Sequence, residues 1–245
     1  MTSEFLRNLP TPEHCLIVLA HPDDAEFFAG GTLAKWAEEG CRLTLFLMTS
    51  GDKGSGDLTT LDGMQVAALR ENEARCAAEK LGIGQVIFQR MKDGELSNSL
   101  ELRRAIVRMI RLKRPDAVMS SDPLLRTRGH NRVNHPDHWS VAEAVLSAVY
   151  PAARDHLNFV ELFRDENLAP HIVKWLYMAL SPMPNYRVET TPYRRIQIDA
   201  LKEHKSQVGD PVQFEKRMHE RYDPDLTIDE TSPRYAEYFR VIQLN

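Results

Sequence analysis

Short apolar runs alternate with longer amphipathic stretches through the first part of the chain. Four apolar runs, each followed by polar residues, predict strands at residues 14–21, 41–49, 85–89 and 116–121. Such runs are typical of strands buried on both faces of a parallel sheet. Helical periodicity predicts helices at residues 25–39, 64–81, 99–113 and 139–150. This alternation predicts an α/β fold, a Rossmann-like, doubly wound, mainly parallel sheet with helices on both faces.

Beyond Pro151 the pattern is weaker. It predicts strands at residues 173–180 and 186–191, a helix at 198–207 and an apolar tail at 235–244 that docks onto the domain. No repeat, low-complexity segment or linker divides the chain. We therefore expect one domain over residues 1–245, with its core at about 14–150 and a C-terminal cap at about 151–245. Gly30 and Gly31 weaken the first helix, and we expect them to allow close packing against the sheet or a ligand.

Two polar tetrapeptides mark the places where chemistry is expected. His21-Pro22-Asp23-Asp24 follows the first strand, and His135-Pro136-Asp137-His138 precedes the helix after the fourth strand. Ligands of open α/β sheets bind at the carboxyl ends of the strands. We call these two tetrapeptides the first and second polar corners. If they face each other at that edge of the sheet, as many as three histidines and three aspartates share one crevice.

A mixed set of imidazole and carboxylate groups with an open position is what a catalytic zinc ion requires. The metal lowers the pKa of bound water from about 16 to about 7, and the remaining side chains can serve as general base, general acid or oxyanion donor. The alternative is that each motif only caps a helix, with Asp23 or Asp24 as the first cap. Two such corners in one chain favour a metal site, and imidazole favours zinc, iron or nickel over magnesium.

Composition and the absence of certain motifs argue against several classes of function. The net charge of −4 argues against broad nucleic-acid binding, and no apolar run has the roughly 18 residues of a membrane helix. Neither a signal peptide, a G-x-S-x-G elbow nor a G-x-G-x-x-G fingerprint is present. The cysteines, Cys15, Cys41 and Cys76, are odd in number and have no C-x-x-C spacing, which favours reduced thiols and a cytoplasmic protein.

Several motifs together resemble the PIG-L/LmbE-like zinc N-deacetylases. They are Ala20-His21-Pro22-Asp23-Asp24-Ala25-Glu26, Gly30-Gly31-Thr32-Leu33-Ala34, the loop at 49–55, Leu69-Arg70-Glu71-Asn72-Glu73-Ala74, Asn134-His135-Pro136-Asp137-His138 and His204-Lys205-Ser206-Gln207. The resemblance extends over about residues 14–145 and resumes at 200–207.

This resemblance implies a role for each motif residue. The implied metal ligands are His21, Asp24 and His138, holding one Zn²⁺ per chain, with Fe²⁺ as the alternative. Asp23 would be the general base, His135 would stabilise the oxyanion or protonate the leaving amine, and Asp137 would orient His135. Arg70 would contact the sugar, although a solvated helix arginine is the other interpretation. The implied activity is hydrolysis of the N-acetyl group of a small amino-sugar derivative by a homo-oligomer.

Two other functions stay open at this point: a metal-dependent hydrolase of another amide or ester, and an inactive binding domain of the same fold. The basic loop with Arg126, Arg128, His130 and Arg132 could hold a phosphate or carboxylate or simply be solvated. Trp139 could stack on a sugar or pack in the core. The loop with Asp52 and Lys53 could close over the pocket.

Overall fold

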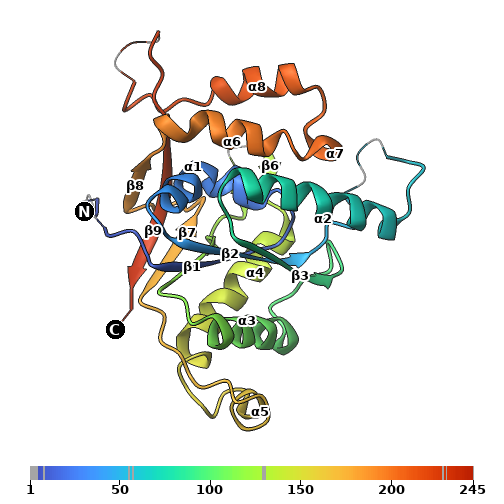
Figure 1. Ribbon diagram of the computed structural model, residues 1–245, viewed down its shortest axis with the longest axis vertical. Helices are drawn as coiled ribbons and strands as arrows, with labels where there is room; N and C mark the ends of the chain where they lie inside the picture. The colour runs from blue at the N-terminus through green and yellow to red at the C-terminus, as the bar shows by residue number, and fades with distance from the viewer. Residues whose placement is uncertain are drawn as a thin grey trace.

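A seven-stranded sheet runs through the centre of the molecule and carries helices on both faces (Figure 1). The computed structural model describes residues 5–7, 9–54, 56, 58–128, 131–227, 229 and 231–244. Across the sheet the strand order is β3-β2-β1-β4-β7-β9-β8. The strands are β1 (His14–Leu19), β2 (Arg42–Thr49), β3 (Gln85–Met91), β4 (Ala117–Ser121), β7 (Trp175–Ala179), β8 (Tyr186–Glu189) and β9 (Ala236–Gln243). The predicted α/β class with a mainly parallel sheet is confirmed.

The order of the strands determines where a ligand can bind. Strands β3, β2, β1, β4 and β7 are parallel, whereas β9 is antiparallel to both β7 and β8. The chain adds β2 and β3 on one side of β1 and β4 on the other. Such a reversal opens a crevice at the carboxyl ends of the strands that flank it, here β1 and β4. Both polar corners of the sequence follow these two strands.

Four helices cover the parallel part of the sheet, two on each face (Figure 1). They are α1 (Asp24–Glu38), α2 (Gly63–Lys80), α3 (Leu100–Lys113) and α4 (Pro136–Ser147). Alternate residues of β1 point to opposite faces. Cys15 and Ile17 belong to the core shared with α1 and α2, whereas Leu16 and Val18 belong to the core shared with α3 and α4. Burial on both faces explains why this strand is apolar throughout.

The C-terminal third forms the cap and also extends the sheet through β7, β8 and β9. Its helices are α5 (Val160–Arg164), α6 (Arg194–Leu201), α7 (Lys205–Val208) and α8 (Pro211–His219). Helix α6 packs on α1 and α2, with α8 outside it (Figure 1). The single helix predicted at residues 198–207 is wrong, because the chain turns at residues 202–204 and separates α6 from α7. Since one sheet contains strands of both parts, we propose that the chain is one domain.

The two glycines of α1 pack against residues of the C-terminal third, which includes the strand β9 of the sheet. A Cβ at Gly31 would lie 2.5 Å from the Cβ of Thr190, and one at Gly30 would lie 2.9 Å from the Gln197 side chain. The helix is kinked just before them, at Ala29. The backbone N–H groups of Gly31 and Thr32 donate to the Glu237 carboxylate of β9 at 2.9 and 2.7 Å. The cap thereby holds the helix that begins at the first polar corner.

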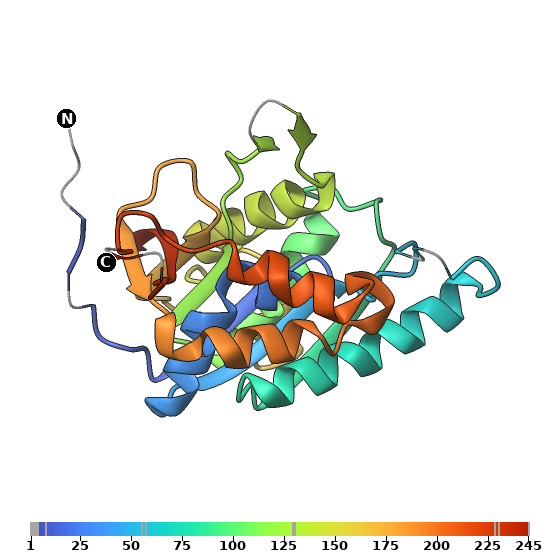
Figure 2. The ribbon, with the colours of Figure 1, turned by 90° about the horizontal axis from the view of Figure 1, so that it is seen from above.

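A small hairpin, formed by β5 (Thr127–Arg128) and β6 (Arg132–Val133), projects from the body of the molecule before α4 (Figure 2). His130, part of the predicted basic loop, lies outside the described residues, as does Ser55 of the loop after β2. No helix within the described ranges combines the length and apolar character that crossing a membrane would need.

Candidate active site

The first polar corner brings two side chains inward directly after β1. His21 and Asp24 are buried. Asp24 Oδ2 accepts the backbone N–H groups of Ala20 and His21 at 3.2 and 2.9 Å, which fixes the carboxylate and leaves Oδ1 free to face the crevice. Asp23 occupies the N-cap position of α1, but its side chain makes no capping hydrogen bond. Neither aspartate therefore acts as the side-chain cap that was considered.

The second corner begins α4 and meets the first. His135 Nδ1 accepts the backbone N–H of Asp137 at 3.2 Å and so caps the helix. Asn134 Oδ1 lies 3.0 Å from His138 Nδ1, which directs His138 Nε2 toward the first corner. The motif thus orients two imidazoles with its own backbone and side chains.

The structure gives Asp137 a different partner from the one expected. Its buried carboxylate accepts the backbone N–H groups of Gly94 and Leu96 at 2.7 and 3.2 Å. One of its oxygens also lies 3.3 Å from His21 Nε2, whereas its backbone N–H, not its carboxylate, bonds to His135. Asp137 therefore orients the His21 ring and anchors the loop after β3.

Three side chains place ligand atoms at the spacing of a tetrahedral zinc site. His21 Nδ1 lies 3.2 Å from His138 Nε2. Asp24 Oδ1 lies 3.1 Å from His138 Nε2, and Asp24 Oδ2 lies 3.6 Å from His21 Nδ1. One ligand atom of each of the three residues lies within 4.8 Å of the others. Tetrahedral zinc with bonds of about 2.0–2.2 Å separates its ligand atoms by about 3.3–3.6 Å. His21, Asp24 and His138 therefore fit one zinc ion without large movement.

The outer partners of the two histidines also fit a metal site. His21 Nε2 faces the carboxylates of Asp93 and Asp137 at 3.1 and 3.3 Å, and His138 Nδ1 faces Asn134. Histidine ligands usually donate their second ring nitrogen to a carboxylate or carbonyl oxygen in this way. Each ring therefore has one nitrogen held by the protein and one directed to the shared centre.

The charges of the cluster favour a bound cation. Burial opposes the charged form of His21, but hydrogen bonds to Asp137, Asp24 and Asp93 outweigh it and raise the pKa of His21 well above its usual value. Burial likewise opposes ionised Asp24, but the neighbouring His138 and His21 hold the pKa of Asp24 well below its usual range. The carboxylates thus draw positive charge into the centre, which a proton or a metal ion can supply.

A pocket of about 480 Å³ opens onto this cluster. Its lining residues are His21, Asp23, Asp24, Phe27, Phe28, Gly54, Arg70, Asp93, Arg132, Val133, Asn134, His135, His138, Gln207 and Arg221. Every residue assigned to the site from the sequence lines this pocket except Asp137, which lies behind His21.

Arg70 is a buried pocket residue and not a solvated helix arginine, with only 4% of its surface exposed. It donates to the carbonyl oxygen of Gly51 at 3.1 Å and to Asp23 Oδ1 at 3.3 Å. A Cβ at Gly54 would lie 2.0 Å from Arg70 Nη1, so the loop approaches the guanidinium closely. Arg70 therefore holds the carboxylate of Asp23 in the pocket.

The sequence analysis missed Asp93. Its Oδ1 lies 3.1 Å from His21 Nε2 and 3.9 Å from His135 Nε2. Asp93 lies in the loop between β3 and α3. An acidic residue just after β3 lies at the same sheet edge as the other polar corners, and that position was the available signal. Gln207 and Arg221 of the cap were also missed as pocket residues.

Trp139 and Asp52, which we had considered near the substrate, each contact another part of the protein. The Arg126 guanidinium lies 4.6 Å from the centre of the Trp139 ring and also pairs with Glu143, so Trp139 stacks on an arginine outside the pocket lining. Asp52 Oδ1 accepts the backbone N–H of Asp93 at 3.0 Å, which ties the loop after β2 to the loop after β3.

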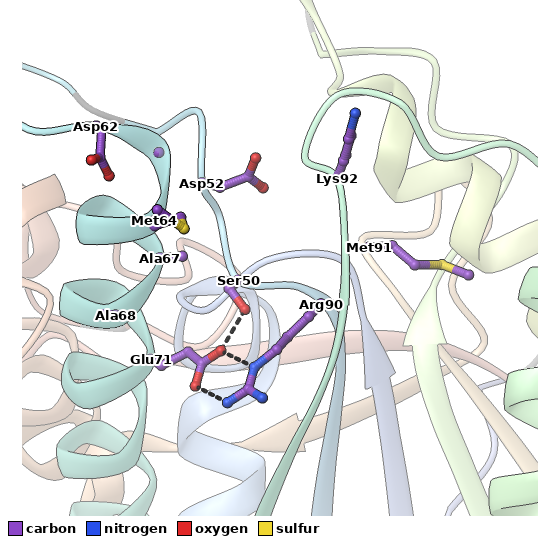
Figure 3. A pocket seen from close by; sticks show the side chains of 11 residues that line it. Ser50, Asp52, Asp62, Met64, Ala67, Ala68, Glu71, Arg90, Met91 and Lys92 are labelled. Carbon is purple, nitrogen blue, oxygen red and sulfur yellow. Dashed lines mark hydrogen bonds and ion pairs between the residues drawn. The ribbon is translucent and has the colours of Figure 1, made fainter.

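A larger hollow of about 690 Å³ lies beside this pocket, between α2 and the end of β3 (Figure 3). Its described lining contains no histidine. Figure 3 shows Glu71 bonded to both Ser50 and Arg90, at 2.7 Å from Ser50 Oγ and 2.8 Å from Arg90 Nε. Glu71 and Arg90 thus neutralise each other. The arrangement suited to metal chemistry is in the smaller pocket.

Comparisons with known proteins agree with this site. The sequence pattern of the PIG-L family, described as GlcNAc-PI de-N-acetylase, matches residues 16–149. The diacetylchitobiose deacetylase of Thermococcus kodakarensis is 30% identical over 197 residues, which cover 80% of this chain and 71% of that protein. The probable N-acetyl-alpha-D-glucosaminyl L-malate deacetylase 2 of Bacillus anthracis is 28% identical over 213 residues, covering 84% and 87%.

A solved structure has a similar fold. The structure of N,N'-diacetylchitobiose deacetylase from Pyrococcus horikoshii superposes with a TM-score of 0.82 at 26% identity, covering 95% of this chain and 84% of that one. The matched region contains both polar corners, and the superposition extends through the cap. The chain therefore belongs to the PIG-L family of de-N-acetylases, and it is an enzyme that hydrolyses amides.

Proposed function

We propose that the protein is a zinc-dependent de-N-acetylase that removes the acetyl group from a small N-acetylglucosamine derivative. The observation that carries this proposal is that His21, Asp24 and His138 each place one ligand atom within 4.8 Å of the others, in a pocket that also contains the carboxylate of Asp23. The names of the relatives support the substrate class, because each denotes an acetylated glucosamine compound. The same ligands also suit Fe²⁺.

In the proposed reaction, His21, Asp24 and His138 hold the metal. When bound, the ion supplies Lewis-acid chemistry, which makes a water molecule a nucleophile at neutral pH and polarises the amide carbonyl. Asp23, held by Arg70, accepts the proton of the attacking water. That proton must then reach the nitrogen, since an amine is a poor leaving group until it is protonated.

His135 is the group placed to assist the leaving amine and the oxyanion. Its Nδ1 accepts a backbone N–H, so the neutral ring has its proton on Nε2, on the side of Asp93 and the pocket. Burial, aided by the charge of His21, lowers the pKa of His135 below its usual value. His135 therefore donates its Nε2–H hydrogen bond to the developing oxyanion, and the proton that Asp23 accepted from the water passes to the leaving nitrogen as the C–N bond breaks. Asp137 acts indirectly, by orienting the ring of His21.

The test combines metal content with product analysis. We expect about one zinc ion per purified chain, measured by plasma mass spectrometry, and release of acetate from N-acetylglucosamine derivatives that a chelator abolishes and zinc restores. Bound metal without acetate release from any such compound would support the alternative, a metal-dependent hydrolase of another amide or ester. A chain that binds no added zinc would instead be an inactive binding domain.

Two further parts of the proposal concern the cell and the assembly. The unpaired cysteines, Cys15, Cys41 and Cys76, suit a reducing compartment, so we place the enzyme in the cytoplasm. Exposed apolar side chains of the C-terminal third, Leu157, Phe163, Ile172 and Met183, support a homo-oligomer. Light scattering coupled to size-exclusion chromatography measures the assembly, and a monomer at micromolar concentration would contradict that part.

A further inference from the structure

Two exposed arginines from distant parts of the chain line the active-site pocket, and their exposure places them on its solvent side, here called the mouth. Arg132 begins β6 in the projecting hairpin, and Arg221 follows α8 in the C-terminal cap. Both are exposed and both line the pocket that contains His21, Asp24 and His138. The hairpin and the cap thus each supply one cation to the same opening.

Neither arginine has a partner within the described part of the chain: no ion pair or side-chain hydrogen bond of Arg132 or Arg221 occurs there. Arg126, close to Arg132 in sequence, is different, because it pairs with Glu143 and stacks on Trp139. Arg70, deeper in the pocket, is paired with Asp23. The arginines at the mouth therefore differ from these neighbours, because no described residue neutralises them.

The carboxylates of the pocket cannot neutralise them. The described lining contains three, and each is engaged elsewhere: Asp23 with Arg70, Asp24 with His138 and Asp93 with His21. Among the described lining residues, the two positive charges of the mouth consequently have no counter-charge. A guanidinium offers planar paired donors that match a phosphate or a carboxylate, and such hydrogen bonds are about twice as strong as neutral ones.

We propose that Arg132 and Arg221 bind an anionic substituent of the substrate, a phosphate or a carboxylate attached to the N-acetylglucosamine unit. The enzyme then prefers a charged conjugate over a neutral disaccharide. This inference rests on the proposed function, since the acetamide must occupy the metal end of the pocket for the substituent to reach the mouth. The relatives' names include both a neutral disaccharide and a malate conjugate, so the two arginines decide between these classes.

The test is a comparison of specificity constants in the zinc-loaded enzyme. The probes are N-acetylglucosamine 1-phosphate and the malyl glycoside of N-acetylglucosamine as anionic substrates, and methyl N-acetylglucosaminide and N,N'-diacetylchitobiose as neutral ones. We expect the ratio of kcat/KM for anionic over neutral substrate to fall about tenfold in Arg132→Gln and in Arg221→Gln, and about a hundredfold in the double variant, mainly through KM. Arg126→Gln, whose cation lies outside the pocket lining, should keep the wild-type ratio.

The two anionic probes identify the substituent, because only the one that matches the site should show the full loss. A wild-type enzyme that does not favour either anionic probe, or a double variant with the wild-type ratio, would overturn the inference while leaving the deacetylase proposal intact. Calorimetry of the same four compounds separates the two proposals further. If the anionic compounds bind through the arginines but no acetate is released, the proposed reaction fails and the anion site stands.

Discussion

At the scale of single residues, His21 is the side chain on which the site depends, because it uses both ring nitrogens. Nδ1 lies with Asp24 and His138 in the candidate metal set, and Nε2 lies against Asp93 and Asp137. The neighbouring aspartates have different tasks as well. Asp24 is fixed by backbone N–H groups, whereas Asp23 is held by the side chain of Arg70.

This division of tasks predicts that two substitutions, both of which lower turnover, have opposite effects on zinc content. Asp23→Asn should keep the bound zinc and lose about 10²–10⁴-fold in kcat, because it removes the proton acceptor and no ligand. His138→Ala should lose both zinc and turnover, because two ligands hold zinc poorly. Metal content and acetate release are measured on each variant. Full activity in Asp23→Asn would show that another group is the base.

Gly54, in the loop after β2, lies close to Arg70, and this contact predicts that a larger residue at position 54 lowers activity. Gly54→Ala would place a methyl group 2.0 Å from Arg70 Nη1 and push the guanidinium away from Asp23. We expect kcat/KM to fall roughly tenfold or more while zinc content is retained, since orientation of the base contributes at least this much. Gly84→Ala is the matched control, because its Cβ would meet only an ordinary contact, 3.8 Å from the Leu43 carbonyl oxygen. Equal activity of both variants would count against the role of Arg70.

At the scale of elements, β1 and its neighbour β2 carry a buried histidine away from the site. His14 of β1 faces Arg42 of β2, whose Nη2 donates to His14 Nδ1 at 3.0 Å, and its Nε2 lies 3.1 Å from Thr44 Oγ1. Burial, with the charge of Arg42 in addition, lowers the pKa of His14 from 6.5 to about 4. The imidazole is therefore neutral in the folded sheet at pH values where the unfolded chain would protonate it.

The consequence is a pH dependence of stability with a definite sign. Between pH 6.5 and about 4 the unfolded chain binds a proton at His14 that the folded chain does not, so stability falls as the pH falls through this window. At about 1.4 kcal/mol per pKa unit, the loss over this window is up to about 3.5 kcal/mol. Urea unfolding across this range, in chelator so that metal loss does not contribute, should show a smaller loss in His14→Gln than in the wild type. His156→Gln, at an exposed histidine, is the control and should keep the wild-type slope.

At the scale of the whole molecule, the pocket is assembled from parts that are far apart in the sequence. The corners after β1 and before α4 supply the metal set, the loop after β3 supplies Asp93, and the cap supplies Gln207 and Arg221. Glu237 of β9 ties the cap to α1 through Gly31 and Thr32. Metal binding should consequently stabilise the fold as a unit, because the ligands come from two elements.

This coupling can be measured as a shift in melting temperature. Zinc at about a hundred times its Kd should stabilise the native state by about 2.7 kcal/mol, which corresponds to a rise in Tm of about 5–10 °C for a chain of this size. A chelator should reverse the rise, and His138→Ala should show none. A rise of the same size in His138→Ala would place the metal elsewhere.

The sequence by itself determined the class of the fold and the main residues of the site. Alternating apolar runs and amphipathic stretches identified strands β1–β4 and helices α1–α4, because burial on both faces of a parallel sheet requires continuous apolar strands. The His/Asp corners were visible because each follows such a strand or begins a helix within a few residues. The local sequence pattern was sufficient to predict an element or a site residue wherever it depends on interactions between residues close together in the chain.

The tertiary structure decided the partners of those residues. Asp137 bonds to the loop after β3 and to His21, Gly31 packs on Thr190, and β9 inserts between β7 and β8. Asp93 and Arg221 enter the pocket from segments with no sequence motif to mark them, and Gln207 enters it from a motif to which we had assigned no role in the site. These outcomes depend on contacts between residues distant along the chain, whose pairing is fixed only when strands take their order in the sheet.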